Sequence, residues 1–403
     1  MASTLLRDVT LVDGSAADVL LDGPRVAAVG APGTVPVADE GGEVIDLSGH
    51  LLLPAAVEPH AHLDKAFLAD IVTNETGDLL GAIDAMRAAR PRLTVPETLE
   101  RAERAARLLA ANGVTAVRSH ADATVDHGLT SIEALVALRD RVVDVIDVEV
   151  VALCGWPVTG AAGTEQRALL RAALDAGADL VGGCPHLEGE GTWDATEVLL
   201  AVAAERGVGV DLHTDEVLDP AVLGLADLAE LVLAMEFPHR VTASHCVSLG
   251  LAPPARQQEV AEAVAAAGIA VVALPATNLY LQGRAHQVAM PRAVTAVKVL
   301  REAGVTVAAG ADNLQDPFNP LGRACPFETA GLMVMTAHVP PADAWAMVSH
   351  HAAVALGRPP ATVSAGQPAD LVAVPAGSLR QAIAFAPGPR HVWHAGRPVA
   401  CAS

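Results

Sequence analysis

Eight short segments rich in β-branched residues, spread over residues 57–310, constrain the fold of this chain more than any other feature. They are Val57–His60, Thr115–His120, Val148–Leu153, Asp179–Cys184, Val208–His213, Arg240–His245, Ala270–Leu274 and Val305–Gly310. Stretches with helical periodicity separate them, for example 96–112 and 256–267, and several are followed by a glycine, as helix ends prefer. Alternating strands and helices form a parallel sheet, and eight such units predict an α/β fold, a (β/α)8 TIM barrel.

The two ends of the chain follow a different pattern. Short strand-like runs are punctuated by turn signals such as Asp-Gly and Gly-Gly. These runs are 9–11, 19–21, 26–29 and 44–47 near the start, and 370–374 and 391–394 near the end. We interpret them as one small β-sandwich domain formed by the N- and C-terminal segments. The predicted boundaries are 1–54 and 361–403 for this domain and 55–360 for the barrel.

Composition excludes several classes of protein. The 26 Lys and Arg face 47 Asp and Glu, a net charge of −21, and no basic cluster offers contacts to phosphates. We therefore expect no nucleic-acid polymer as partner. Hydrophobic residues make up 52% of the chain, which excludes disorder. Only ten residues are Phe, Trp or Tyr, so we expect a core of Ala, Val and Leu.

The same sequence argues against a membrane or secreted location. Charged residues and glycines interrupt every apolar run well short of the ~18–20 residues of a spanning helix. The first thirty residues lack a basic cap followed by an apolar block, so we predict no secretory signal. Five scattered cysteines, an odd number without a CxxC motif, indicate reduced thiols in a cytoplasmic protein.

Histidines and carboxylates gather where the predicted strands end. In a barrel of this type the active site lies at the carboxyl ends of the strands. The residues in question are His60, His62, His120, His186, His213 with Glu216, His245 and Asp312. His60 and His62 alternate along one strand and point to the same side, so two imidazoles can grip one cation. With His213 and Asp312 they predict a site for one divalent metal ion, zinc or iron.

Several strings resemble cytosine deaminase, a member of the amidohydrolase superfamily. The similarity runs from about Leu53 to Gly357 in the order of that family's motifs, and 366–372 resembles the return strand of its β-domain. The strings are Glu58-Pro59-His60-Ala61-His62-Leu63-Asp64-Lys65-Ala66-Phe67, His213-Thr214-Asp215-Glu216, Val241-Thr242-Ala243-Ser244-His245, Asn278 with Leu281-Gln282-Gly283-Arg284, and Asp312 followed by Asp316-Pro317.

The resemblance implies a role for each matching residue. The metal ligands would be His60, His62, His213 and Asp312. Glu216 would be the acid/base that moves a proton from the metal-bound water to a ring nitrogen and then helps the amino group leave as ammonia, while the hydroxide so formed attacks the ring. His245 would hold the attacking hydroxide, and Asp312 would also take part in proton removal. For Lys65 the expected role is a structural ion pair. For His120 we expect packing or support of the metal ligands, since the ligand set is already complete without it.

Two departures from related enzymes bear on the substrate. The fourth predicted strand ends without the lysine that bridges two metals in binuclear relatives, which favours a mononuclear deaminase. Where cytosine deaminase places a glutamine after the third strand, this chain has Gly155 and Trp156, and Asn313 replaces a second aspartate. We therefore expect an aminated N-heterocycle or cyclic amidine other than cytosine. The candidate substrate-binding residues are Gly155, Trp156, His186, Gln282, Asn313 and Phe318.

Other functions remain open at this point. One alternative keeps the metal but releases an alkylamine from a triazine-like ring, or opens a cyclic amide. Another is a non-catalytic barrel that binds a ligand, although such a protein would be free to lose Glu216, His245 or Asp312, and all three are present. Family members commonly form homo-oligomers, and the acidic composition speaks only for solubility.

Overall fold

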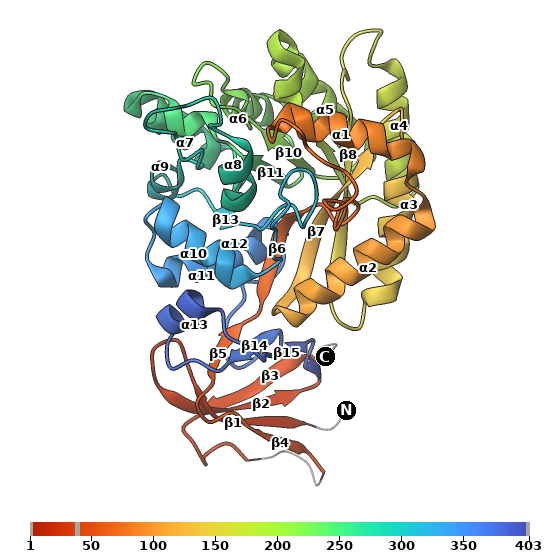
Figure 1. The fold of residues 1–403 in the computed structure, drawn as a ribbon. Helices are drawn as coiled ribbons and strands as arrows, with labels where there is room; N and C mark the ends of the chain where they lie inside the picture. Colours follow the sequence, from red (N-terminus) through yellow and green to blue (C-terminus); the bar gives the residue numbers. More distant parts are fainter. Residues whose placement is uncertain (1–2, 37–40, 400–403) are drawn as a thin grey trace.

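The computed structural model describes residues 3–36 and 41–399, which form a barrel and a separate β-sheet beside it (Figure 1). The two chain ends lie close together at the sheet, far from the helices that cover the opposite end of the barrel (Figure 1). Strand β5 (Leu51–Pro54) belongs to the sheet and β6 (Ala56–Ala61) to the barrel, so the chain passes from one to the other within a few residues.

Eight parallel strands follow one another around the barrel in sequence order, as the alternating pattern predicted. After β6 they are β7 (Val114–Ala123), β8 (Asp147–Cys154), β9 (Leu180–Gly183), β10 (Val210–Thr214), β11 (Val241–His245), β12 (Ala270–Ala273) and β13 (Val307–Ala309). The barrel closes where Ala61 pairs in parallel with Asp312, just beyond β13. In this register His213 stands beside Ser244 and Thr214 beside His245, so the strand ends share one level.

Helices cover the outside of the barrel, and the first of them, α1 (Leu79–Ala89), crosses its open end (Figure 1). The other α-helices are α2 (Val95–Ala111), α3 (Thr130–Val142), α4 (Thr164–Asp175), α5 (Thr192–Arg206), α6 (Gly224–Ala234), α7 (Pro254–Ala266), α8 (Pro275–Leu281), α9 (Val297–Glu302), α10 (Pro326–Thr336), α11 (Pro341–Val348), α12 (His350–Ala355) and α13 (Leu379–Phe385). The described residues also form 3-10 turns: η1 (Arg90–Arg92) between α1 and α2, η2 (Pro185–Gly191) between β9 and α5, and η3 (Ser248–Leu251) between β11 and α7. The core between helices and strands is mainly Ala, Val and Leu, as the shortage of aromatic residues predicted.

The second part is a sheet of eight strands taken from both ends of the chain, as predicted. Besides β5 these are β1 (Thr4–Thr10), β2 (Ala16–Asp22), β3 (Arg25–Gly30), β4 (Glu43–Asp46), β14 (Leu371–Val374), β15 (His391–His394) and β16 (Arg397–Pro398). Strand β14 pairs with β5, which joins the last segment of the chain to the first. The sheet has its own apolar core, in which Trp393 packs with leucines and valines of β1, β2 and β5.

The structure bears on the predictions about membrane-spanning helices and about the cysteines. Within residues 3–36 and 41–399 no helix combines the length and apolar character needed to cross a membrane. Cys154, Cys184, Cys246 and Cys325 are free thiols, as predicted, and Cys401 lies outside the described residues.

Candidate active site

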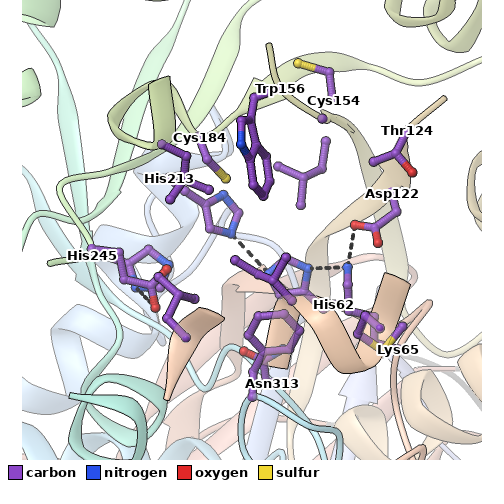
Figure 2. A pocket seen from close by; sticks show the side chains of 18 of the residues that line it. His62, Lys65, Asp122, Thr124, Cys154, Trp156, Cys184, His213, His245 and Asn313 are labelled. Carbon is purple, nitrogen blue, oxygen red and sulfur yellow. Dashed lines mark hydrogen bonds and ion pairs between the residues drawn. The ribbon is translucent and has the colours of Figure 1, made fainter. Parts of the chain in front are cut away.

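A pocket opens at the carboxyl ends of the barrel strands, where the sequence placed the active site (Figure 2). Its polar floor consists of His62, His213, Glu216, His245 and Asp312. Its other walls are largely apolar, with contributions from α1 and from the loops after β8 and β13. Three of the four predicted metal ligands and the acid/base residues therefore line one cavity, whereas His60 is fully buried and is not among the lining residues.

The four predicted metal ligands converge at the base of this pocket. His213 Nε2 lies 3.2 Å from His60 Nε2 and 3.2 Å from His62 Nε2. Asp312 Oδ1 lies 3.7 Å from His60 Nε2 and 3.4 Å from His62 Nε2. Ligand-type atoms of the three histidines, and likewise those of His60, His245 and Asp312, lie within 4.8 Å of one another. This arrangement suits a single cation.

The chemistry of these donors also fits a divalent metal. Burial, with smaller contributions from neighbouring groups, lowers the pKa of His60, His62 and His213 well below the ordinary value, so the imidazoles are neutral, which is the form that can bind a metal. Burial, reinforced by the charge of Asp316, raises the pKa of Asp312 to about 8. Both Asp312 carboxyl oxygens are buried without a hydrogen-bond partner among the described residues. A cation would satisfy them.

The two histidines of the His-x-His motif meet different partners through Nδ1. His60 Nδ1 lies 2.8 Å from Ser244 Oγ, beneath the cluster. His62 Nδ1 lies 3.2 Å from Lys65 Nζ, which also contacts Asp122 at 2.7 Å and Asp64 at 3.4 Å (Figure 2). An ammonium group only donates, so this contact places the His62 proton on Nε2. Metal ligation by His62 therefore requires that proton to move to Nδ1, leaving Lys65 paired with the two aspartates.

Local backbone structure holds the strand ends in position. Glu58 accepts hydrogen bonds from the backbone N–H groups of His60 and Ala311, and so ties β6 to the loop that carries Asp312. His245 and Asp312 adopt left-handed backbone conformations, with φ of 69° and 65°. Such strained conformations at non-glycine residues persist where the surrounding structure enforces them, often at functional sites.

Glu216 and His245 stand beside the cluster as the sequence predicted. Burial raises the pKa of Glu216 well above its usual range, and the charge of Asp312 adds to this. The His245 imidazole lies beside Glu216, with Nδ1 3.6 Å from Oε1, and burial lowers the pKa of His245 to about 3, so this ring is neutral. His245 Nδ1 also lies 2.9 Å from Asn278 Oδ1. In the same motif, Asp215 accepts hydrogen bonds from the first backbone N–H groups of α6 and is structural.

Five of the six candidate substrate-binding residues line the pocket, namely Gly155, Trp156, His186, Asn313 and Phe318. A Cβ atom at Gly155 would lie 3.0 Å from Gln166 Oε1 and 3.1 Å from Thr124 Cγ2, so this position leaves little room for a side chain. His186 Nδ1 donates to the His213 carbonyl oxygen at 3.1 Å.

Gln282 is placed differently. It is not among the lining residues, and its side-chain amide donates to the backbone carbonyl of Glu216 at 2.9 Å. Asn313 lines the pocket, but its amide group donates to Asp316 at 2.8 Å. The structure therefore gives both amides a partner within the protein.

Sequence reasoning missed part of the pocket wall. Leu79, Ile83 and Met86 of α1 line it, and their i, i+4, i+7 spacing was the available signal. Asp122 and Arg90 also line it and pair at 2.9 Å, an ion pair that no local pattern indicates. His120 is buried, with its ring centroid 4.0 Å from that of His60 and its Nε2 3.6 Å from Asp211 Oδ1, so it packs directly behind a predicted ligand.

The closed parallel barrel carries its imidazoles and carboxylates at the carboxyl end, where barrel enzymes have their active sites. A family model described as "Amidohydrolase family" matches residues 68–400, and the chain belongs to this family. A protein named Pterin deaminase from Rhizobium rhizogenes is 34% identical over 377 residues, which cover 91% of this chain and 81% of that protein.

Two solved structures are similar over nearly their whole length. One is 5-methylcytosine deaminase from Klebsiella pneumoniae liganded with 5-fluorocytosine, with a TM-score of 0.88 and 27% identity, covering 99% of this chain and 98% of that one. The other is N-isopropylammelide isopropylaminohydrolase from Burkholderia multivorans, with a TM-score of 0.85, 29% identity and the same coverage. The first supports the resemblance to cytosine deaminase that the motifs indicated.

Proposed function

We propose that this protein is a metal-dependent deaminase that replaces an exocyclic amino group of an N-heterocycle with oxygen and releases ammonia. The observation that carries the proposal is the convergence of His60, His62, His213 and Asp312 at the base of a pocket, with Glu216 and His245 beside them. The first four residues would hold one divalent ion, zinc or iron. When bound, such an ion polarises water and makes hydroxide available at neutral pH.

Glu216 is the proposed acid/base. Its raised pKa allows the carboxyl group to carry a proton in a buried site, which a shuttle between water and substrate requires. It takes a proton from the attacking water and gives it to the ring nitrogen beside the attacked carbon. The bond from that carbon to the amino group then breaks, and ammonia leaves with the remaining proton. The ring carbon keeps the water oxygen as a carbonyl.

His245 and Asp312 are proposed to assist this transfer. The Nδ1 contact with Asn278 fixes the orientation of the His245 ring, and Nε2 has no partner among the described residues. His245 can therefore hydrogen-bond the attacking oxygen and the tetrahedral centre that follows. Asp312, whose carboxyl oxygens have no hydrogen-bond partner among the described residues, accepts the second proton of the attacking water and passes it to the departing amino group.

The pocket walls suggest a flat substrate with apolar faces and a polar edge. Leu79, Ile83 and Met86 face the cavity from α1, and Trp156 and Phe318 add two aromatic rings. A flat heterocycle would bury its faces against these side chains while its polar edge meets the floor. The relative named Pterin deaminase makes the pterin ring the first candidate, and the liganded 5-methylcytosine deaminase makes pyrimidines the second.

A second candidate reaction releases an alkylamine in place of ammonia. It is favoured by the similarity to N-isopropylammelide isopropylaminohydrolase over 99% of this chain. The same proton transfers serve both reactions, because the leaving amine takes up the second proton of the attacking water in either case. The two reactions differ only in the leaving group, which is ammonia in the first and an alkylamine in the second.

The test is a panel of heterocycles offered to the purified, metal-loaded protein. Pterin, 5-methylcytosine, cytosine and N-isopropylammelide are incubated in parallel, with ammonia measured by a coupled assay and products identified by mass spectrometry. Ammonia from an aminated ring supports the deaminase, and isopropylamine without ammonia supports the second reaction. If no member of the panel or of a broader set of aminated rings is converted, the proposal is refuted.

Glu216→Gln provides the mechanistic check. We expect it to retain metal and lose turnover by about 10²–10⁴-fold, because only proton transfer is removed. Glu197→Gln on the exposed face of α5 is the matched control and should behave as wild type. Near-normal turnover by Glu216→Gln would show that another group moves the proton.

A further inference from the structure

A buried chain of polar side chains crosses the inside of the barrel beneath the proposed metal ligands. It runs from Arg118 on β7 through Asp211 on β10 and Ser244 on β11 to His60 on β6, and all four residues have 0% exposure. Arg118 Nη1 lies 2.9 Å from Asp211 Oδ2, Ser244 Oγ lies 2.9 Å from Asp211 Oδ1, and His60 Nδ1 lies 2.8 Å from Ser244 Oγ. Each member therefore contacts the next.

The chemistry of these groups sets the direction of every hydrogen bond in the chain. Arginine only donates, so the Asp211 oxygen that faces Arg118 accepts, as an ionised carboxylate does. The other Asp211 oxygen also accepts and takes the single hydroxyl proton of Ser244. The Ser244 oxygen then has only lone pairs to offer His60. The proton between Ser244 and His60 must sit on His60 Nδ1.

This direction leaves the lone pair of His60 on Nε2, which faces the centre of the cluster, 3.2 Å from His213 Nε2 and 3.7 Å from Asp312 Oδ1. A neutral imidazole binds a metal through the nitrogen that carries the lone pair. We propose that Ser244 and Asp211 are positioning residues that hold His60 in the metal-binding tautomer. The inference rests on the proposed metal site and assigns residues that touch neither metal nor substrate.

The other two histidine ligands are not arranged in this way. His213 Nδ1 has no hydrogen-bond partner in the part of the chain that the structure describes, and His62 Nδ1 faces Lys65. His60 is thus the one of the three whose tautomer is set for ligation by the protein itself. His60 is therefore ready to bind the ion without moving a proton, whereas His62 would have to move its proton to the other ring nitrogen when the ion binds.

The hydrogen bonds that run from Arg118 to His60 also predict what happens when donors and acceptors exchange places along them. In Asp211→Asn, Arg118 still requires an acceptor and holds the amide oxygen, so the new NH2 group faces Ser244. That group donates to the Ser244 oxygen, and the Ser244 hydroxyl must then donate to His60 Nδ1. The proton of His60 moves to Nε2, where it blocks the metal. This substitution preserves shape and changes the pattern of donors and acceptors.

The experiment measures zinc affinity by competition with a chromophoric chelator, without any substrate. We expect Ser244→Ala and Asp211→Asn to bind zinc about 10–100-fold more weakly than wild type. Ser244→Thr keeps the hydroxyl and should restore most of the affinity. Ser349→Ala is the control, because Ser349 is equally buried but donates to a backbone carbonyl of α11. Melting curves confirm that each variant is folded.

The outcomes separate this inference from the metal site itself. Wild-type affinity in both Ser244→Ala and Asp211→Asn would overturn the positioning role while leaving the metal site intact. An equal loss in Ser349→Ala would also overturn it, because the effect would then be general to buried serines. A wild-type protein that binds neither zinc nor ferrous iron refutes the metal site and the inference together.

Discussion

An ion network joins the terminal sheet to the barrel and yields a quantitative prediction. His394 of β15 lies 3.1 Å from Asp370 and 3.6 Å from Asp147, the first residue of β8, and Arg358 also pairs with Asp147. Burial alone would lower the pKa of His394. Hydrogen bonds and charge from Asp147 and Asp370 outweigh burial and raise it to about 9, from 6.5. His394 is therefore a cation in the folded protein at neutral pH.

The size of the effect follows from this shift. A rise from 6.5 to about 9 corresponds to at most about 3 kcal/mol of stability. The side chains of Asp147 and Asp370 are 40% and 24% exposed, so solvent screens the pair and we expect about 1–2 kcal/mol. Because the folded pKa is the higher one, this contribution is complete below pH 6.5 and disappears as the pH rises through about 9.

His394→Asn tests this reasoning by removing the charge while keeping a polar side chain. Urea unfolding followed by circular dichroism should show a loss of about 1–2 kcal/mol near pH 6 that vanishes above about pH 9. His286→Asn, at an exposed loop position, is the control and should show no loss at either pH. A deficit of the same size at both pH values would refute the electrostatic explanation and point to packing.

Two further substitutions test the site and its support. His62→Ala should lose metal and activity together, and full metal occupancy by elemental analysis of that variant would contradict the proposed ligand set. Arg118→Met should destabilise the fold by about 3–5 kcal/mol in urea unfolding, because Asp211 would keep a fully buried charge without its partner. A loss below about 1 kcal/mol would mean that the Asp211 carboxyl group becomes neutral at little cost.

Much of the fold was predictable because its signals are local. Alternation of β-branched runs with helical stretches identified all eight barrel strands, although the second runs on to Ala123, three residues beyond the predicted end at His120. The turn signals near both chain ends identified the terminal sheet. These patterns depend on neighbouring residues, which determine strand and helix without knowledge of distant contacts.

The candidate site was predictable only as far as strand ends determine position. His60, His62, His213 and Asp312 converge because parallel strands end at one edge of a barrel. Gln282 follows the seventh strand, but its side-chain amide donates to the backbone carbonyl of Glu216. Its position in the sequence after that strand did not indicate which way the side chain points. The apolar face of α1 carries a helical signal, but its position over the pocket depends on how the loop after β6 folds back.

The sequence alone determined the order of strands and helices, the chemistry available at each strand end and the family resemblance, since these follow from residue type and local periodicity. The tertiary structure decided which nitrogen of His60 faces the cluster, and it did so through partners far away in the chain. Ser244 is 184 residues from His60, and Asp211 lies 33 residues before Ser244. Hydrogen-bond direction depends on such distant contacts, because a donor or acceptor acquires its role only when its partner is in place.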